Sequence, residues 1–429
     1  MLLLLACTAS PPDSVPLPSA PLGQGFTVET QETPPDAQVP EERWYPAPLS
    51  PTACPDPIYQ PQPGNLPSPP ILAEPSSDVL GSEAFPRYLH LGMGSTESLI
   101  VLWATDEATK VSQVELSLED GSQFVIDGAS FTLVDDPLLR RVHEVRVCGL
   151  PAGTRLHYRA GGAGTWSDPA EVRMPGEELL AVVVGDTRGD PTTWGMILNA
   201  AETLDPDLIL FTGDMVPVGK ELDDWWQWLQ AGEGILDHRI LLSTHGNHEG
   251  MAQAFFGLLG LPGNEQWFSL DFPSAHLSFF NDSGISTEVD DQVAWLQQDL
   301  ADARAPWKLT IHHQPAFSSS QVHAVSSTVL YQFVPVMEAG GVKLDLSGHN
   351  HHYERMLPLR DGLFTPGGTV YVVTAGGGAP LYPNLGDQPT SAAVAVAEHY
   401  TVLRIQPHQI RGQAIDLAGN ILDQFELQQ

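Results

Sequence analysis

Six short apolar runs in the C-terminal part of the chain each end in polar or glycine residues. They occupy residues 179–186, 207–214, 240–249, 307–315, 342–355 and 370–378. Continuous runs of valine, isoleucine and leucine are typical of strands that are buried on both faces, as in parallel sheets. Loops at strand ends are where enzymes often carry reactive side chains. The pattern therefore predicts buried strands whose ends converge on one functional site.

Apolar residues also recur at helical spacing between these runs, and further strands close the chain. The expected helices lie at 194–201, 222–229 and 291–301, and the closing strands at 400–405, 411–415 and 421–427. Strands that alternate with helices indicate an α/β domain, here with substantial β content. We place this domain at residues 177–429.

The preceding part of the chain divides into a β-rich domain and a proline-rich tail. Short alternating segments with Gly/Pro turns predict a β-sandwich at 83–176, which lacks a clustered acid, base or metal-ligand set and is expected to be structural. Residues 8–82 are a tail or linker. The tail is either a spacer or a strap along the folded domains, in which case Trp44, Tyr45 and Ile58 would anchor it.

The chain is strongly acidic, because 53 acidic and 19 basic residues give a formal charge of −34. Nucleic acid is bound through a Lys/Arg surface that neutralises phosphates, so this balance argues against a nucleic-acid partner. An anionic substrate must instead be attracted by local cations, which bound metal ions can supply.

Three cysteines occur, and the absence of a CxxC pair argues against a zinc ribbon or a redox motif. Residues 1–7 are interpreted as a truncated signal, in which Leu4-Leu5-Ala6-Cys7 resembles a bacterial lipobox. We therefore expect an exported lipoprotein, periplasmic or on the cell surface, whose membrane contact is a lipid anchor at Cys7. A fortuitous match is the alternative, because no positive charge precedes it. Cys54 and Cys148 then remain as a pair, for which we hypothesise a disulfide.

The residues at the ends of the runs are of types that bind metal ions. They are Asp186, Asp214, Asn247, His313, His349 and His351. Hard or borderline ions accept carboxylate, amide and imidazole together, and two ions about 3.5–4 Å apart are expected to share a ligand. Asp214 is the best candidate for the shared carboxylate. Residues at i and i+2 of an extended segment point to the same side, so His349 and His351 can reach one centre.

These segments resemble the five sequence blocks of the calcineurin-like metallophosphoesterases. The blocks are Gly185-Asp186, Gly213-Asp214, Gly246-Asn247-His248-Glu249, His313-Gln314-Pro315 and Gly348-His349-Asn350-His351. Residues 352–355, the preceding sandwich and the glycines of 375–378 look like the purple acid phosphatase branch. The resemblance covers residue 85 to the C-terminus and implies two packed mixed β-sheets flanked by helices, after a fibronectin-like sandwich.

The resemblance also implies roles for individual residues. One metal ion would bind Asp186, Asp214 and His351, and a second would bind Asp214, Asn247, His313 and His349; the metals would be Fe, Zn or Mn. His248 would lie beside the phosphate as an electrophile or as the acid for the leaving group, and His323 would face the substrate. In the tandem His312-His313 the second residue is preferred, because family members place this ligand two residues before a proline.

Two positions depart from the family pattern. Purple acid phosphatases have a tyrosine three residues after the bridging aspartate, which ligates ferric iron and gives the colour, and here this residue is Pro217. Other metallophosphoesterases have a histidine two residues after the first aspartate, and here it is Arg188. Water, phosphate or a residue from elsewhere could replace the missing ligand, or Arg188 could clamp a substrate oxygen, since guanidinium matches phosphate geometry.

The sequence thus predicts an acid phosphatase-like phosphomonoesterase that acts on a phosphorylated small molecule, with a metal-bound hydroxide attacking phosphorus in line. A phosphodiesterase or nucleotidase on the same site is one alternative. The other is a surface-displayed binding protein with impaired catalysis, which Arg188 and Pro217 motivate. The chain contains no Gly-x-Ser-x-Gly elbow that would support serine chemistry.

Overall fold

The computed structural model describes residues 50–55, 71, 73–283 and 288–429. Cys7 and the lipobox-like segment therefore lie outside the described residues, as do Trp44, Tyr45 and Ile58. Within the described residues, no helix is both long enough and apolar enough to cross a membrane.

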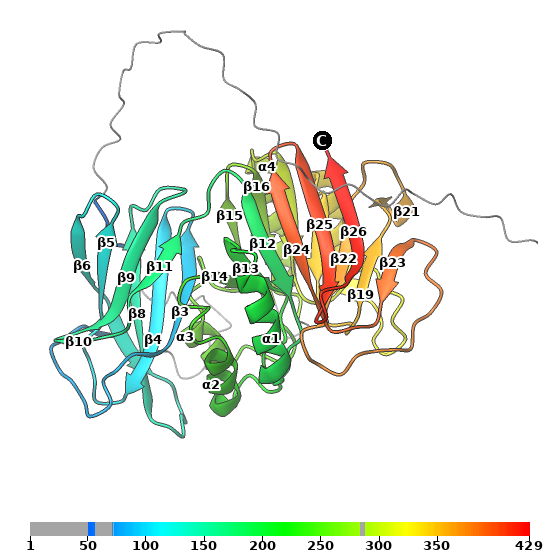
Figure 1. Cartoon of the computed structure of the whole chain (residues 1–429). Helices are drawn as coiled ribbons and strands as arrows, with labels where there is room; N and C mark the ends of the chain where they lie inside the picture. Colours follow the sequence, from blue (N-terminus) through cyan, green and yellow to red (C-terminus); the bar gives the residue numbers. More distant parts are fainter. Residues whose placement is uncertain (1–49, 56–70, 72, 284–287) are drawn as a thin grey trace, which may run out of the picture. The chain divides into compact units, whose positions relative to one another are not determined.

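Residues 87–173 form a sandwich of two antiparallel sheet regions (Figure 1). One contains β1 (Thr52–Ala53), β2 (Glu74–Pro75), β3 (Arg87–Ser95), β4 (Ser98–Asp106), β7 (Ala129–Thr132) and β8 (Arg140–Cys148). The other contains β5 (Gln113–Leu118), β6 (Gln123–Asp127), β9 (Arg155–Gly162), β10 (Thr165–Trp166) and β11 (Ala170–Arg173). Buried and partly exposed residues alternate along these strands. In β5, Val114, Leu116 and Leu118 are buried, and the residues between them are partly exposed. The expected all-β domain is confirmed.

Two described pieces of the predicted linker are part of this sandwich. β1 pairs with β8 and β2 pairs with β7, both antiparallel. Next to β1, Cys54 forms a disulfide with Cys148, with the two Cα atoms 5.1 Å apart. These segments therefore follow the folded domain as a strap, and the hypothesised cysteine pair is present.

The C-terminal part contains two sheets that share one hydrophobic core. In the first, β12 (Leu179–Val184), β13 (Leu208–Phe211) and β14 (Ile240–Ser243) are parallel, and β24 (His399–Gln406), β25 (Gln409–Asp416) and β26 (Ile421–Gln428) continue it antiparallel. The second has the order β15 (Phe268–Asp271), β16 (Ala275–Phe279), β17 (Trp307–Ile311), β18 (Leu344–Ser347), β22 (Val370–Thr374), β19 (Tyr353–Met356) and β23 (Ser391–Ala395). A small hairpin joins β20 (Leu359–Arg360) to β21 (Leu363–Phe364). The six apolar runs are all strands, as predicted.

Helices cover the outer faces of these sheets. They are α1 (Pro191–Glu202), α2 (Leu222–Ala231), α3 (Gln253–Leu258), α4 (Val289–Asp302), the π-helical turn η1 (Val329–Phe333) and α5 (Val334–Gly340). Trp194 of α1 stacks on Trp228 of α2, while α4, η1 and α5 form a second core around Phe280. α1, α2 and α4 were predicted; α3 and the η1–α5 segment were not.

The sandwich and the C-terminal domain share one continuous sheet. Leu91 of β3 pairs in parallel with Ile240 of β14, and the Met93 N–H donates to the Gly260 carbonyl at 3.0 Å. The Tyr158 hydroxyl donates to the carbonyl of Asp237. Backbone pairing thus links the N-terminal sandwich to a strand that ends in the predicted site.

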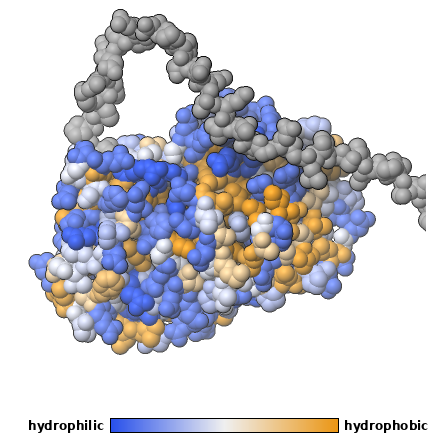
Figure 2. All heavy atoms as spheres, viewed as in Figure 1, coloured by the Kyte–Doolittle hydropathy of each residue, from blue (hydrophilic) through white to orange (hydrophobic). Residues whose placement is uncertain are grey.

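Hydrophilic residues cover much of the face in Figure 2, in keeping with the acidic composition. An apolar area lies over the C-terminal strands in the same view. Among these strands, Val394 of β23 and Ile421 of β26 are exposed.

We expect the Cys54–Cys148 disulfide to stabilise the sandwich, because it closes a loop of 94 residues and so restricts the unfolded chain. Replacing both cysteines by serine should lower the free energy of unfolding by about 2–4 kcal/mol. Denaturant unfolding of the double variant, with Cys7→Ser as the matched control, measures the effect. An unchanged unfolding midpoint in the double variant would contradict it.

Candidate metal centre

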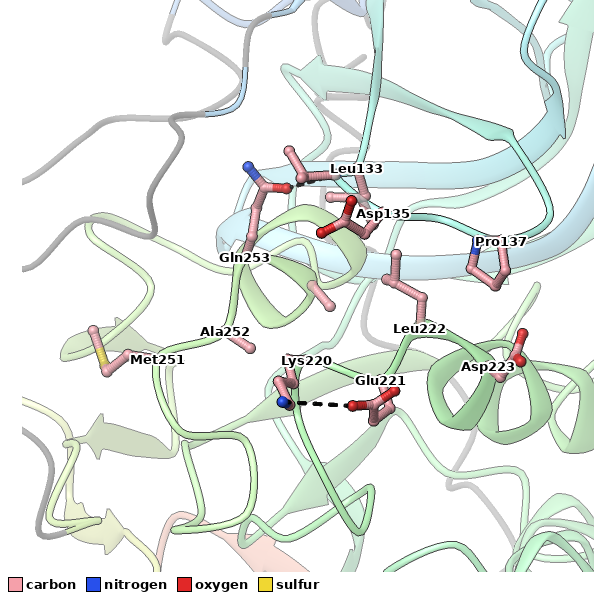
Figure 3. Close-up of a pocket in the computed structure, with 12 residues that line it drawn as sticks. Leu133, Asp135, Pro137, Lys220, Glu221, Leu222, Asp223, Met251, Ala252 and Gln253 are labelled. Atoms are coloured by element: carbon pink, nitrogen blue, oxygen red, sulfur yellow. Dashed lines mark hydrogen bonds and ion pairs between the residues drawn. The ribbon is translucent and has the colours of Figure 1, made fainter.

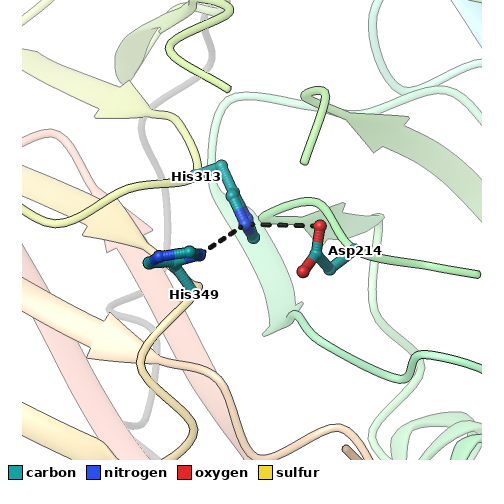
Figure 4. Close-up of side chains that lie close together, drawn as sticks. All are labelled: Asp214, His313 and His349. Carbon is teal, nitrogen blue, oxygen red and sulfur yellow. Dashed lines mark hydrogen bonds and ion pairs between the residues drawn. The ribbon is translucent and has the colours of Figure 1, made fainter. Parts of the chain in front are cut away.

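The predicted ligands follow the carboxyl ends of strands in both C-terminal sheets. One sheet contributes Asp186, Asp214 and Asn247 after β12, β13 and β14, and the other contributes His313, His349 and His351 after β17 and β18. Parallel strands end at a common edge, and ligands of α/β sheets bind outside that edge. Figure 4 shows Asp214, His313 and His349 from the two sheets pointing toward one another.

Three of these residues have a backbone conformation that is uncommon for residues with a side chain. The φ angle is 62° at Asp186, 59° at Asp214 and 66° at His349. Such strain clusters at functional sites and persists where the surroundings enforce it. Nearby glycines leave the room that the carboxylates need: a Cβ at Gly246 would lie 2.1 Å from Asp214 Oδ1, and one at Gly348 would lie 2.5 Å from Asp186 Oδ2. The blocks therefore require glycine at these two positions.

Four donors surround one point, and we call Asp214, Asn247, His313 and His349 the Asp214 set. His313 Nε2 lies 3.3 Å from Asp214 Oδ1, 3.0 Å from Asn247 Oδ1 and 3.2 Å from His349 Nδ1. Ligand atoms of Asp214, His313 and His349 all lie within 4.8 Å of one another. Nitrogen and oxygen ligands bind zinc at about 2.0–2.2 Å, so donors at such separations can surround a single ion. The Asp214 set fits a metal ion.

Hydrogen bonds fix the ring of His313 in this set. Its Nδ1 donates to the Thr212 carbonyl at 2.8 Å, and its backbone N–H donates to Asp282 Oδ1 at 3.0 Å. Because Nδ1 is engaged by a carbonyl, Nε2 faces Asp214. Ligand imidazoles are usually oriented in this way, with one nitrogen held by an outer partner.

The electrostatic field in the Asp214 set favours a cation. Burial alone would lower the pKa of His313, but nearby carboxylates, chiefly that of Asp214, raise it to about 10. Burial alone would raise the pKa of Asp214, but His313 and His248 hold it below its usual range. Burial and the positive charge of His313 lower the pKa of His349 to about 3, so this imidazole is neutral and suited to bind a metal.

We call Asp186, Asp214 and His351 the Asp186 set. It differs from the Asp214 set because an arginine contacts one of its ligands. His351 Nδ1 donates to the Pro380 carbonyl at 2.7 Å, and its Nε2 lies 3.4 Å from Asp186 Oδ1. Arg188 Nη1 also lies 3.4 Å from this Nε2. The cationic side chain of Arg188 therefore contacts His351 Nε2, the nitrogen that a first metal ion would use. In this arrangement the Asp186 set does not fit an ion.

His248 and His323, which were also predicted to face the substrate, lie around these ligands. His248 donates from Nδ1 to the Pro217 carbonyl at 2.6 Å, and its backbone N–H donates to Asp214 Oδ1 at 2.9 Å. The His323 ring lies 4.7 Å from the His349 ring, and its Nε2 is 3.1 Å from the Tyr382 hydroxyl. Tyr382 in turn stacks on His351, with ring centroids 4.1 Å apart and planes at 18°. Tyr382 was not predicted, and no motif around it indicates this position.

Glu249 holds the loops of the Asp214 set together, a role that the sequence analysis did not assign. Its buried carboxylate accepts the backbone N–H groups of Asp214, Met215, Val216 and Gly246 at 2.9, 2.7, 3.3 and 2.7 Å. Burial and then the charge of Asp214 raise the pKa of Glu249 to about 7. The sequence did contain a signal for this residue, because Glu249 ends the Gly-Asn-His-Glu block.

The rings of the adjacent residues His312 and His313 contact different carboxylates. His312 is fully buried between two carboxylates, with Nδ1 2.8 Å from Asp282 Oδ2 and Nε2 3.1 Å from Asp345 Oδ1. His313 alone of the two faces Asp214. Asp282 therefore contacts both, through the ring of His312 and the backbone of His313, and helps to position the second.

A separate cavity of about 670 Å³ opens between the loop after β7 and the loops that follow β13 and β14 (Figure 3). Its lining includes Asp135, Lys220, Glu221 and Gln253, and Lys220 pairs with Glu221 at 3.8 Å. None of the six predicted metal ligands lines it. The cavity is therefore distinct from the Asp214 set.

Two protein families match the chain in adjacent segments. Residues 179–353 match the calcineurin-like phosphoesterase family, and residues 86–174 match the purple acid phosphatase N-terminal domain. Purple acid phosphatase 18 of Arabidopsis thaliana is 24% identical over 320 residues, covering 69% of this chain and 72% of the plant protein. Human acid phosphatase type 7 is 26% identical over 351 residues, covering 69% and 78%.

Two solved structures share the fold of this chain. Purple acid phosphatase PPD1 from yellow lupin seeds superposes with a TM-score of 0.72 at 17% identity, covering 80% of this chain and 74% of the lupin chain. PhoD gives a TM-score of 0.61 at 12% identity, covering 81% and 91%. The chain thus contains a calcineurin-like phosphoesterase domain preceded by a purple acid phosphatase N-terminal domain, and it is a metal-dependent hydrolase of phosphate esters.

Proposed function

We propose that this protein is a phosphomonoesterase whose substrate is a phosphorylated small molecule and whose reaction depends on an ion held by Asp214, Asn247, His313 and His349. The observation that carries the proposal is that donor atoms of the other three residues lie 3.0–3.3 Å from His313 Nε2. A bound ion would lower the pKa of a water ligand and polarise the phosphoryl oxygens.

The protein's own residues would bind and orient the ester. Arg188 has five N–H donors in a planar fork, which suits two oxygens of one phosphate. His248 donates from Nδ1 to the Pro217 carbonyl, so in its imidazolium form the Nε2–H is left to donate to the phosphate or to protonate the leaving oxygen. His323, which contacts Tyr382, lies beside His349 and would contact the distal part of the substrate.

We further propose that the protein is exported. The Cys54–Cys148 disulfide supports this location, because disulfides persist in oxidising compartments. A lipid anchor at Cys7 would hold the protein at a membrane surface. Mass spectrometry of the mature N-terminus would identify an acylated cysteine.

Asp214 and His248 should have separable effects on turnover. Asp214→Ala should remove the bound ion and hydrolysis together, because the residue supplies the central carboxylate. His248→Ala should keep the metal content and lower kcat by about 10²–10⁴-fold, the usual contribution of a positioned acid. Metal analysis alongside hydrolysis of a chromogenic phosphomonoester and diester gives both readouts, with the exposed His408→Ala as the control. Unimpaired hydrolysis by Asp214→Ala would refute the assignment.

Glu249 should act through metal affinity. Glu249→Ala leaves four buried N–H groups without their acceptor, so the loop that carries Asp214 loses its anchor. We expect metal affinity to fall about 10–100-fold, as for other residues that orient ligands, while kcat at saturating metal changes less. Glu249→Gln, which keeps one acceptor oxygen, should lie between. Metal titration is the measurement, and equal affinities of the wild type and Glu249→Ala would contradict the role.

The iron-loaded protein should be colourless. The purple colour of the related enzymes needs a tyrosinate on ferric iron, and Pro217 stands at that position. A visible absorption spectrum after loading with Fe³⁺ tests this expectation. A tyrosinate-to-iron band would show that another tyrosine, with Tyr382 as the nearest candidate, binds the metal.

A further inference from the structure

Arg188 occupies a specific place in the Asp186 set. Its Nη1 lies 3.4 Å from His351 Nε2, and His351 Nδ1 already donates to the Pro380 carbonyl. In this tautomer Nε2 carries the lone pair, which receives the guanidinium N–H. We propose that the guanidinium of Arg188 replaces the first metal ion, so that the protein works with a single ion in the Asp214 set. This inference rests on the proposed function and extends it.

The distances leave no room for both cations. Imidazole nitrogen binds a metal at about 2.0–2.1 Å. An ion on the His351 lone pair would lie well inside the contact distance of Arg188 Nη1, which is 3.4 Å from that nitrogen. The two positive charges would also repel each other in a buried site, where screening by water is weak. Binding of an ion to this set therefore requires the guanidinium to leave.

The backbone of Arg188 holds the side chain at this position. Its φ angle is 40°, and its N–H donates to the Asp214 carbonyl at 3.0 Å. The Tyr382 hydroxyl forms a hydrogen bond with the guanidinium, and this contact acts to lower the pKa of the tyrosine against the larger effect of burial. The side chain is thus bounded by His351 and Tyr382, two residues that stack on each other.

The carboxylate of Asp186 has a hydrogen-bond donor from the protein itself, without an ion. Both oxygens of Asp186 accept the backbone N–H of His349, at 3.1 and 2.9 Å. In the Asp214 set, by contrast, His313 Nε2 faces two oxygens and the nitrogen of His349. One set is thus arranged as a ring of ligands, and the other is arranged around an arginine.

A fixed arginine would supply one part of what a second ion supplies. Guanidinium stays protonated at all working pH values, so the positive charge beside the phosphate does not depend on metal supply. The N–H groups that His351 and Tyr382 leave free can take phosphate oxygens. Arg188 would then bind the ester, and the Asp214 set would hold the ion.

Metal stoichiometry tests the inference directly. The full-length protein is saturated with Mn²⁺ or Zn²⁺, freed of loose metal by gel filtration, and analysed for metal per chain. We expect about one ion in the wild type and about two in Arg188→His, where an imidazole replaces the guanidinium. Arg188→Lys, the matched control, keeps the charge and should stay near one. Asp186→Asn should also stay near one, because no ion depends on this carboxylate.

Electron paramagnetic resonance of the Mn²⁺-loaded samples gives a second readout. Wild type should show isolated Mn²⁺, and Arg188→His should show a magnetically coupled pair. Two ions per wild-type chain, a coupled pair in wild type, or loss of an ion in Asp186→Asn would overturn the inference. If Arg188→His does not fold, the wild-type and Asp186→Asn counts still decide the question.

Hydrolysis of a chromogenic phosphomonoester by the same samples separates this inference from the proposed function. One ion per chain with measurable hydrolysis supports both. Two ions with hydrolysis overturn the role of Arg188 and support the phosphomonoesterase. One ion without hydrolysis overturns the phosphomonoesterase, while the count still supports the displacement of the first ion by Arg188.

Discussion

The hydrogen bond from His313 Nδ1 to the Thr212 carbonyl joins the two C-terminal sheets where the ligands meet. Thr212 follows β13 and His313 follows β17, so this 2.8 Å contact sets how the strand ends of the two sheets face each other. Gly213 makes the approach possible, because a Cβ there would lie 2.8 Å from the same Nδ1. The distances among Asp214, Asn247, His313 and His349 all depend on this contact. A shift of one sheet along the other would separate the donors.

The side chains at the centre explain how an acidic protein can act on an anionic substrate. The formal charge of −34 belongs largely to solvated side chains, whereas the centre concentrates Arg188, His248 and His323 beside the buried Asp186 and Asp214. Arg188 is partly buried, so water screens its charge less than that of a fully exposed side chain. Local arrangement therefore outweighs net charge at the site.

The strands and the ligand types could be predicted from the sequence because both are local properties. Buried parallel strands appear as apolar runs such as 179–184, and the residue that follows each run must lie at the sheet edge. The unpredicted α3 and η1–α5 segments are short, and Pro335 and Gly340 weaken the helical signal of α5. These segments form because Phe333 and Met337 pack in the second core, which is a tertiary effect.

The roles of individual side chains were less accessible, because they depend on contacts between distant segments. Tyr382 reaches the centre through stacking on His351, 31 positions earlier, and no local pattern marks it. The sequence left open whether Arg188 clamps substrate or leaves a ligand missing. The contact with His351 Nε2 adds a third interpretation, replacement of the ion, that spacing alone could not suggest.

The central claim is that Asp214, Asn247, His313 and His349 hold the ion on which the reaction depends. Anomalous X-ray diffraction from crystals of the metal-loaded protein, collected at the absorption edge of the bound metal, tests it most directly. The account predicts a peak bonded to Asp214 Oδ1, Asn247 Oδ1, His313 Nε2 and His349 Nδ1, at about 2.0–2.2 Å as expected for such donors. Density for a fully bound ion elsewhere in the chain, with none among these four atoms, would contradict it.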